Sequence, residues 1–349
     1  MEIIRTLIVA VIGGTIASLL HAPLPWTLGP IFAVALASFL ERRTYVFPLR
    51  IRNIALIALG YSMGRPFTVE TGQAIAADFP LMLFATVVTV SAGIFTGWLM
   101  ERRTQINLVS CLMGCVPGGL SQMVVLADEI PEADLTAVTI MQTLRMLSVV
   151  CIIPFLAVNM LPHDGGGEAA ALAAGSTMQA LAFAAVAVVG ALLAKRLHLP
   201  TAALLGPILA TAIFVCLTGW TAPLVPELGL DVAQVCVGSY IGSNVHLRRI
   251  SEYHGMGPVL FGGVLLVLMV SMFMGWFVSH VTAISIVTGF LSTAPGGLAE
   301  MGIVALEVGA DTATMTAYQL TRLLFIMLVF PYIMRWFVRR RQRVQAKEN

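Results

Sequence analysis

The chain alternates long apolar stretches with short polar ones, and the alternation occurs twice. Six apolar segments in the first half span residues 3–20, 26–40, 50–64, 79–100, 105–127 and 135–159, and six in the second half span 178–194, 202–218, 229–245, 258–279, 283–306 and 312–337. A helix that crosses a membrane needs about 20 apolar residues. The pattern therefore predicts membrane-spanning helices, and the second and third segments of each set are short enough to require burial inside a bundle.

The two halves repeat each other residue by residue, which indicates an internal duplication. At an offset of 177, the matches include Gly13 with Gly190, Leu28-Gly29-Pro30 with Leu205-Gly206-Pro207, Gln142 with Gln319, and Arg145 with Arg322. At an offset of 178, Pro117-Gly118-Gly119-Leu120 matches Pro295-Gly296-Gly297-Leu298. The register holds along nearly the whole of each half.

The fifth segment of each half carries Pro-Gly-Gly in its middle. Proline lacks the N–H that a helix needs, and two glycines favour irregular backbone, so a continuous helix facing lipid is excluded. Each fifth segment should be two half-helices, which form either a re-entrant hairpin or a broken span.

Basic residues decide between these two arrangements, because lysine and arginine gather in cytoplasmic loops. Of the 20 basic residues, Arg145 and Arg322 lie within apolar segments. If both fifth segments are hairpins, 17 of the other 18 fall on one side and only Arg65 on the other. If every segment crosses, the split is 13 to 5. The hairpin arrangement is favoured, and it gives each half five spans, so the second half inserts upside down.

These observations predict an all-α polytopic membrane protein with an inverted-topology internal repeat, about five spans plus one Pro-Gly-Gly re-entrant or broken helix hairpin per half. The expected organisation is repeat 1 at residues 1–160, an extracytoplasmic linker at 161–177, the inverted repeat 2 at 178–338, and a basic cytoplasmic tail at 339–349. Both termini should lie in the cytoplasm, and the expected location is the bacterial inner membrane.

Composition supports this class and excludes others. Hydrophobic residues make up 58% of the chain and charged residues 11%, against roughly 25% charged in soluble proteins. A soluble enzyme, a disordered protein and a nucleic-acid binder are excluded. The five cysteines lie in apolar runs and are expected to be reduced packing residues, and no set of side chains has the spacing of a metal site. We expect no metal, no cofactor and no enzymatic activity.

The Pro-Gly-Gly breaks are the first candidate binding elements. A half-helix that begins at Gly118 or Gly296 would present free N–H groups and the positive end of its dipole at mid-membrane depth. The substrate-binding candidates here are Pro117, Gly118, Gly119, Ser121, Gln122, Pro295, Gly296 and Gly297. The alternative is that Pro-Gly-Gly is only a packing kink, and its duplication favours a site.

Two buried arginines are the second candidate elements. Arg145 and Arg322 each lie about 15 Å into a segment, where an arginine costs at least about 2.5 kcal/mol. Gln142 and Gln319 stand three positions earlier, on the same helix face. Guanidinium groups match carboxylates, so these four residues are further substrate-binding candidates. The alternative is an internal ion pair, for example with Glu300.

The two Pro-Gly-Gly-Leu motifs are followed by different residues at two positions: Glu300 stands where the first half has Gln122, and Ala299 where it has Ser121. A carboxyl at such depth is a candidate ion-coupling group, for H⁺ or for Na⁺, or a partner for an arginine. Asp134 and Asp311 precede the sixth segments and are expected to cap these helices.

The duplicated motifs carry a family resemblance. "LHAPLPWTLGP" with "LHLPTAALLGP", "PGGLSQM" with "PGGLAEM", and "QTLR" with "QLTR" resemble the bacterial AbrB-type duplicated membrane family, whose members are also labelled ammonia monooxygenase or AbrB-family transcriptional regulator. The resemblance covers essentially the whole chain. It implies a relation to inverted-repeat cation:proton antiporter and anion-transporter folds.

Three functions compete at this stage. A secondary transporter of a small organic anion or similar solute, coupled to H⁺ or Na⁺ and working by alternating access, agrees with paired interrupted helices in an inverted repeat. A regulatory effect on gene expression would be indirect, and a membrane monooxygenase needs a metal cluster that the chain does not supply. The expected partners are the solute, the coupling ion and the lipid bilayer, with no nucleic acid, and a homo-oligomer is left open.

Overall fold

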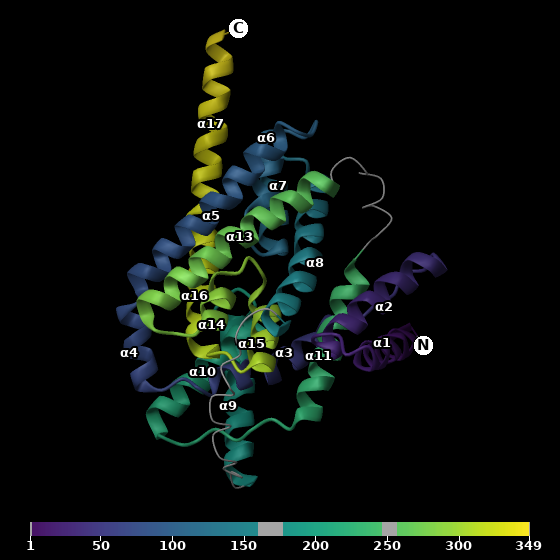
Figure 1. The fold of residues 1–349 in the computed structure, drawn as a ribbon, viewed down its shortest axis with the longest axis vertical. Helices are drawn as coiled ribbons and strands as arrows, with labels where there is room; N and C mark the ends of the chain where they lie inside the picture. Colours follow the sequence, from purple (N-terminus) through teal and green to yellow (C-terminus); the bar gives the residue numbers. More distant parts are fainter. Residues whose placement is uncertain (1, 160–176, 246–256, 349) are drawn as a thin grey trace. The chain divides into compact units, whose positions relative to one another are not determined.

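The structure is a computed structural model that describes residues 2–159, 177–245 and 257–348 (Figure 1). Every regular element in these residues is a helix. The predicted linker lies outside the described residues except for residue 177, so its place stays a prediction. Six described helical stretches are long and apolar enough to cross a membrane, and the last of them, Thr312–Arg340, consists of two consecutive helices. The chain is therefore an all-α polytopic membrane protein.

The helices follow the predicted segments closely. In the first half they are α1 (Glu2–Leu19), α2 (Pro25–Glu41), α3 (Leu49–Gly64), α4 (Val69–Ala77), α5 (Phe79–Glu101), α6 (Leu108–Cys115), α7 (Leu120–Glu129) and α8 (Leu135–Asn159). In the second half they are α9 (Thr177–Arg196), α10 (Ala202–Thr218), α11 (Glu227–Asn244), α13 (Gly257–Thr282), α14 (Ile286–Thr293), α15 (Leu298–Val308), α16 (Thr312–Leu328) and α17 (Phe330–Glu348).

Both predicted interruptions are confirmed, since α6 ends before Pro117 and α14 ends before Pro295. Two elements differ from the prediction. The short α4 was not expected, and the hydroxyl of Thr68 caps it by accepting from the Thr71 N–H at 3.1 Å. The last apolar segment is two helices because Pro331 cannot donate the hydrogen bond that would join α16 to α17.

The described chain folds into two compact units, and each draws on both sequence halves. Unit 1 comprises residues 1–77, 153–248 and 299–316, and unit 2 comprises residues 78–152, 249–298 and 317–349. The compact units thus differ from the sequence repeats, which are stretches of continuous chain.

Unit 1 contains α1 to α4, α9, α10 and α11, nearly all of α15, the end of α8 and the start of α16. Helix α1 packs on α2 and α9 on α10, while α2 also packs on α11 and α3 on α10. Glycine allows the closest approaches: a Cβ on Gly29 would meet the carbonyl oxygen of Gly13, and a Cβ on Gly206 would meet that of Gly190. The two contacts are related by the offset of the sequence repeat, so the duplicated glycines have a common packing role.

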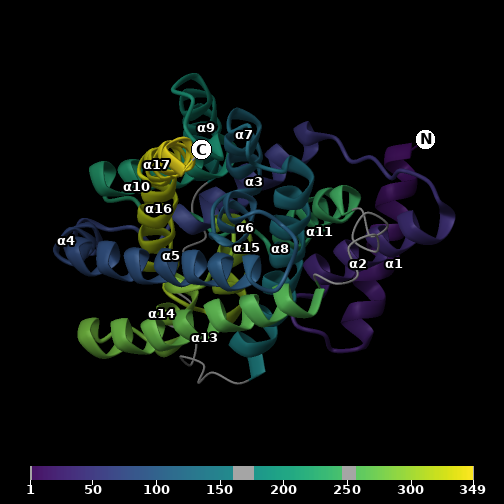
Figure 2. The same ribbon diagram turned by 90° about the horizontal axis from the view of Figure 1, so that it is seen from above.

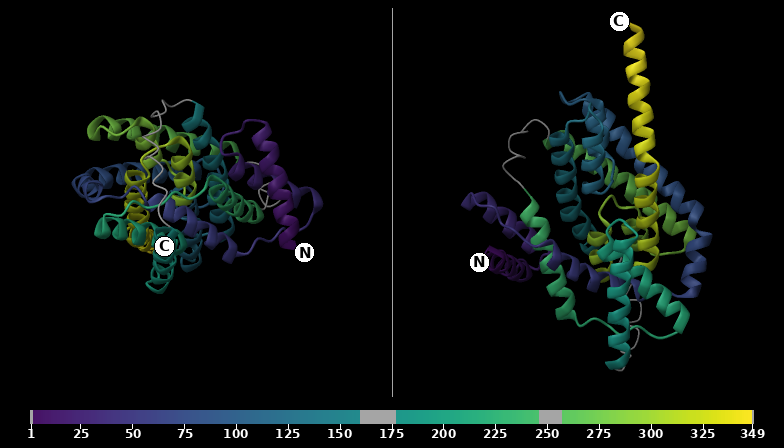
Figure 3. Two further views of the ribbon diagram at one scale, coloured as in Figure 1. Left: turned by 90° about the horizontal axis from the view of Figure 1, so that it is seen from below. Right: turned by 180° about the vertical axis from the view of Figure 1, so that it is seen from behind.

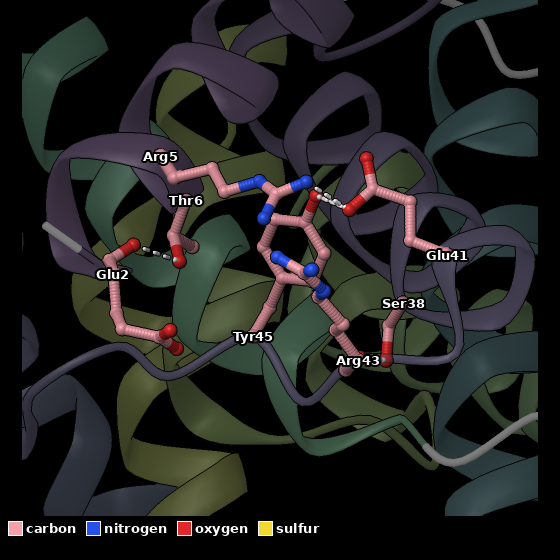
Figure 4. A network of polar contacts seen from close by, with 7 residues as sticks. All are labelled: Glu2, Arg5, Thr6, Ser38, Glu41, Arg43 and Tyr45. Carbon is pink, nitrogen blue, oxygen red and sulfur yellow. Dashed lines mark hydrogen bonds and ion pairs between the residues drawn. The ribbon is translucent and has the colours of Figure 1, made fainter.

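A polar network joins the start of α1 to the end of α2 (Figure 4). Arg5 and Tyr45 both donate hydrogen bonds to the Glu41 carboxylate, the tyrosine at 2.9 Å, and the Arg5 guanidinium lies 5.5 Å from the centre of the Tyr45 ring. Thr6 donates to the backbone oxygen of Val46 at 3.2 Å. Burial, and then the hydrogen bond to Glu41, raise the pKa of the Tyr45 hydroxyl, so it stays protonated and donating at ordinary pH.

Unit 2 contains α5, α6, α7, α13, α14 and α17, with most of α8 and α16. Helices α5 and α13 run side by side, and α6 packs on α5 as α14 packs on α13 (Figure 2). A buried apolar cluster gathers side chains from α6, α7, α8, α16 and α17, among them Leu112, Met123, Val138, Ile326 and Phe330. Helix α17 runs on from the end of α16 (Figure 3). The cluster holds both half-helices of the first interruption in place.

Candidate functional site

The interruption between α6 and α7 is defined at both ends by the backbone. The Asn107 side chain accepts from the Ser110 N–H and begins α6, and extended backbone at Val116 (φ −66°, ψ 132°) ends it. Gly119 is also extended, and α7 begins at the next residue without a side-chain cap. The second interruption repeats the first, since Ser285 caps α14 by accepting from the Thr288 N–H. Pro-Gly-Gly therefore separates two half-helices in each case.

The first interruption folds back on itself as a hairpin of two half-helices. The Asn107 amide donates to the backbone oxygen of Glu132 at 2.8 Å, and the Asp134 N–H donates to the Ser110 hydroxyl at 2.7 Å. These bonds hold the chain that follows α7 against the beginning of α6. Helix α7 therefore returns to the level from which α6 starts. The residues that would show the same return after α14 belong to the other unit, so the second hairpin stays a prediction.

Two buried glutamines hold the ends of the first half-helices. Gln142 Nε2 donates to the backbone oxygens of Met113 at 2.7 Å and Val116 at 3.1 Å. Gln319 Nε2 donates in the same way to Leu291 at 2.7 Å and Ala294 at 3.1 Å. The last carbonyls of a helix have no partner within the helix, and in lipid they must find one in the protein. The glutamines supply it.

The two arginines also donate to backbone oxygens at the interruptions, but Arg322 makes more of these hydrogen bonds than Arg145 does. Arg145 Nη2 donates to the Gly118 oxygen at 3.1 Å and to Gln142 Oε1 at 2.8 Å. Arg322 Nη2 donates to the Gly296 oxygen at 2.7 Å and to Gln319 Oε1 at 2.5 Å, and its Nη1 also donates to the backbone oxygens of Ala294 and Thr293. Both nitrogens at the end of the Arg322 fork are therefore engaged by the fold.

Arg145 has donors that the fold does not use. Only 8% of this residue is exposed, and its Nε and Nη1 are buried with no hydrogen-bond partner in the described residues. A cavity of about 10 Å³, the size that holds one water, lies beside it and is lined also by Thr96, Cys115 and Pro295. Neither arginine is within 4 Å of a carboxylate in the described part of unit 2. A buried guanidinium with open N–H groups is suited to binding an anion.

The structure brings the predicted substrate-binding residues into one unit. The residues of the first half lie in the α6–α7 interruption, in the first turn of α7, and in the middle of α8. The residues of the second half lie in the α14–α15 interruption and in α16. Within α7, the Gln122 and Met123 side chains cover Gly119 and Gly118. Ser121 lies in the first turn of α7, and its side chain is outside the described part.

The predicted ion-coupling residue belongs to the other unit. Glu300 is in the first turn of α15, partly buried, and Arg52 is the charged side chain of unit 1 that acts on it electrostatically. The Arg52 guanidinium also lies 4.8 Å from the centre of the Tyr240 ring. Glu300 thus has a cationic neighbour within its own unit.

Asp134 and Asp311 cap helices, as predicted. Asp134 Oδ1 accepts from the N–H groups of Thr136 and Ala137 at 2.9 and 3.1 Å, and Asp311 Oδ1 accepts from those of Ala313 and Thr314 at 2.9 and 3.3 Å. In the ranges that the structure describes, no three His, Cys, Asp or Glu side chains gather as metal ligands.

Sequence reasoning missed the acceptors of the glutamines and arginines. These acceptors are backbone oxygens, so residue type gives no sign of them. The available signal was positional, because Met113, Val116 and Gly118 are offset by 178 from Leu291, Ala294 and Gly296, and Gln142 and Arg145 by 177 from their counterparts. A pair of side chains that repeats beside a pair of interruptions indicates a contact between them.

Comparisons with known proteins find one family model and two relatives that match most of the chain. A family model described as "Transition state regulatory protein AbrB" matches residues 26–338. The chain is 28% identical over 345 residues to "Uncharacterized protein YhjN" of Bacillus subtilis (strain 168), with 91% of this chain and 88% of the relative covered. It is 28% identical over 318 residues to "Putative regulator AbrB" of Escherichia coli (strain K12), with 90% of each covered.

Proposed function

The chain belongs to the AbrB family, and from that premise we propose that it is a secondary transporter that carries a small organic anion by alternating access. The observation that carries this proposal is Arg145. Its Nε and Nη1 are buried and unpartnered, beside an interruption that opens a helix N-terminus at Gly119. An unpaired buried cation is costly, and an anion bound at the interruption would compensate the cost.

The chemistry of the site favours a small anion. Arg145 can offer its Nε–H and its Nη1–H as separate donors on the two sides of the guanidinium, while its Nη2 keeps the group in place through Gly118 and Gln142. The first N–H groups of α7 lack a side-chain cap and add the positive end of a helix dipole. The binding group is thus held by the fold before the anion arrives.

The coupling ion and the membrane are part of the same proposal. Glu300 is the proposed coupling group, for H⁺ or for Na⁺, because it is the carboxyl that breaks the symmetry of the two hairpins. The proposed location is the bacterial inner membrane, with both termini in the cytoplasm. The placement of the basic residues supports this orientation.

A regulatory role is the second candidate, because the relative from Escherichia coli carries the name "Putative regulator AbrB". On this account the protein would change gene expression indirectly, by moving a solute that another protein senses. Transport then remains the molecular activity, and the two proposals differ only in its consequence.

The first experiment measures ligand-dependent stability. The protein is reconstituted in lipid nanodiscs, and its unfolding is followed with a panel of small carboxylates, amino acids and inorganic anions. A ligand at 100 times its dissociation constant should add about 2.7 kcal/mol of stability. The effect should vanish in Arg145→Gln, recover in part in Arg145→Lys, and persist in the control Arg103→Gln, an exposed arginine outside the site.

The outcomes separate the hypotheses. If no anion stabilises the wild type, or if Arg145→Gln responds as fully as wild type, the anion site is refuted. A stabilising compound is then tested for uptake into proteoliposomes under an imposed H⁺ or Na⁺ gradient. We expect one gradient to drive uptake and Glu300→Gln to abolish that drive, and uptake that ignores both gradients would refute the coupling.

A further inference from the structure

A groove follows α7 in unit 2 and is separate from the small cavity beside Arg145. It encloses about 460 Å³, within the range of pockets that hold small molecules. Met123, Val125 and Leu126 line it from α7, and residues of α16 and α17 line it from the other side, among them Ile326, Met327, Pro331 and Tyr332. Most of its wall is apolar.

The polar groups of the groove lie at its two ends. Gln122 is in the first turn of α7, next to the interruption, and Glu129 is the last residue of that helix. Seven residues of helix span about 10 Å. At the far end the Arg335 guanidinium donates to the Glu129 carboxylate at 2.6 Å, and each side chain is 50% exposed. The groove is thus mostly apolar along its length, with an ion pair at one end and Gln122 at the other.

The ion pair can open at little cost. Half-exposed pairs of this kind contribute close to nothing to stability, because water replaces the interaction. Once open, the pair offers a guanidinium fork for a carboxylate and a carboxylate for an ammonium group. A plain anion would meet the negative charge of Glu129, and a plain cation would meet the positive charge of Arg335. A zwitterion satisfies both charges at once.

We propose that this groove is a binding site for a zwitterionic α-amino acid with a large apolar side chain. The carboxylate binds Arg335, the ammonium group binds Glu129, and the side chain lies along Leu126 and Tyr332. The ring of Tyr332 favours an aromatic ligand. The assignment rests on the transport proposal and narrows its substrate to a carboxylate that also carries an ammonium group, because the groove follows α7 from the end that lies next to the interruption.

The test uses matched ligands with the full-length protein in lipid nanodiscs. Binding of tritiated phenylalanine is measured by scintillation proximity, with phenethylamine, hydrocinnamate and glycine as competitors. These lack the carboxylate, the ammonium group and the side chain, respectively. Each should compete at least about tenfold less well than phenylalanine, the effect of one lost charge-assisted hydrogen bond or of the lost apolar contact. Equal competition by the three analogues would overturn the proposal.

Variants assign each charge. Arg335→Gln should remove the advantage of phenylalanine over phenethylamine, and Glu129→Gln should remove its advantage over hydrocinnamate. The control Arg339→Gln changes an exposed arginine of the same helix and should bind as wild type. The combined exchange Glu129→Arg with Arg335→Glu keeps both charges and should keep binding, which guards against a folding defect. If both single variants still prefer phenylalanine to phenethylamine and to hydrocinnamate as the wild type does, the proposed site is wrong.

Arg145→Gln distinguishes this proposal from the preceding one. It should leave phenylalanine binding in the groove intact while it removes anion stabilisation at the interruption. If phenylalanine binding depends on Arg145 and not on Arg335 or Glu129, the ligand occupies the deeper site, and the groove assignment is wrong while the transport proposal stands.

Discussion

Arg145 and Arg322 occupy equivalent positions in the repeat, yet we predict that their loss has unequal effects on stability. Arg322 donates to Gly296, Gln319 and Ala294, with a weaker bond to Thr293 at 3.4 Å. Arg145 donates only to Gly118 and Gln142. A hydrogen bond from a charged group contributes roughly 1.5–3 kcal/mol. Arg322→Gln should therefore lower the free energy of unfolding by about 3–5 kcal/mol.

Arg145→Gln should cost less than about 2 kcal/mol, because it also removes a buried cation whose Nε and Nη1 are unpaired. The assay is unfolding by sodium dodecyl sulfate in mixed micelles, followed by tryptophan fluorescence and far-ultraviolet circular dichroism. Arg103→Gln is the control and should not change stability. If Arg145→Gln destabilises the protein as much as Arg322→Gln does, the open N–H groups of Arg145 are part of the fold, and the argument for an anion there fails.

Three further predictions concern the packing and the caps, and the same unfolding assay measures each. Gly206→Ala should destabilise unit 1 by about 2 kcal/mol or more, because the new Cβ would collide with the backbone of Gly190. Gly262→Ala is the control: a Cβ there has no atom within 4 Å, so the change should be neutral or stabilise by up to about 1 kcal/mol. Equal effects of the two changes would contradict the close approach. Asp134→Ala should lower the free energy of unfolding by about 1 kcal/mol through loss of the α8 cap, and Asp134→Asn should retain most of the stability that the cap provides. An alanine variant as stable as wild type would refute the cap. Tyr45→Phe should cost about 1 kcal/mol by removing the hydrogen bond to Glu41, and no cost would show that water replaces the tyrosine there.

The helices could be predicted from the sequence because their signals are local. The lengths of the apolar segments predicted both ends of α8 and of α10 without error, and the Pro-Gly-Gly motifs predicted both interruptions. The caps at Asp134 and Asp311 followed from residue type and position. Each of these features depends on neighbours in the chain, and the solvent is lipid throughout the spans, so hydropathy alone marks their ends.

The sequence could not predict which side chains meet. Gln142 and Arg145 were candidates for a ligand, and the structure shows that much of their donor capacity serves carbonyls about 25–30 residues earlier in the chain. The pairing of Glu129 with Arg335 joins residues 206 positions apart. Neither contact has a local signal, because both depend on how α7, α8 and α17 pack. The different numbers of hydrogen bonds that Arg145 and Arg322 donate could not be predicted either, because the two Gln-x-x-Arg motifs match in sequence.

The interleaved composition of the two units has a consequence for biosynthesis. Unit 1 takes segments from residues 1–77, 153–248 and 299–316, and unit 2 takes the segments between and after them. A ribosome that has made the first half has therefore completed neither unit, and helices α1 to α3 must wait in the bilayer for partners that are synthesised much later. Contacts over such sequence distances form slowly. The emerging chain is accordingly exposed to proteolysis and quality control until almost its last helix has been inserted, and a truncated chain should be degraded rather than accumulate as a folded half.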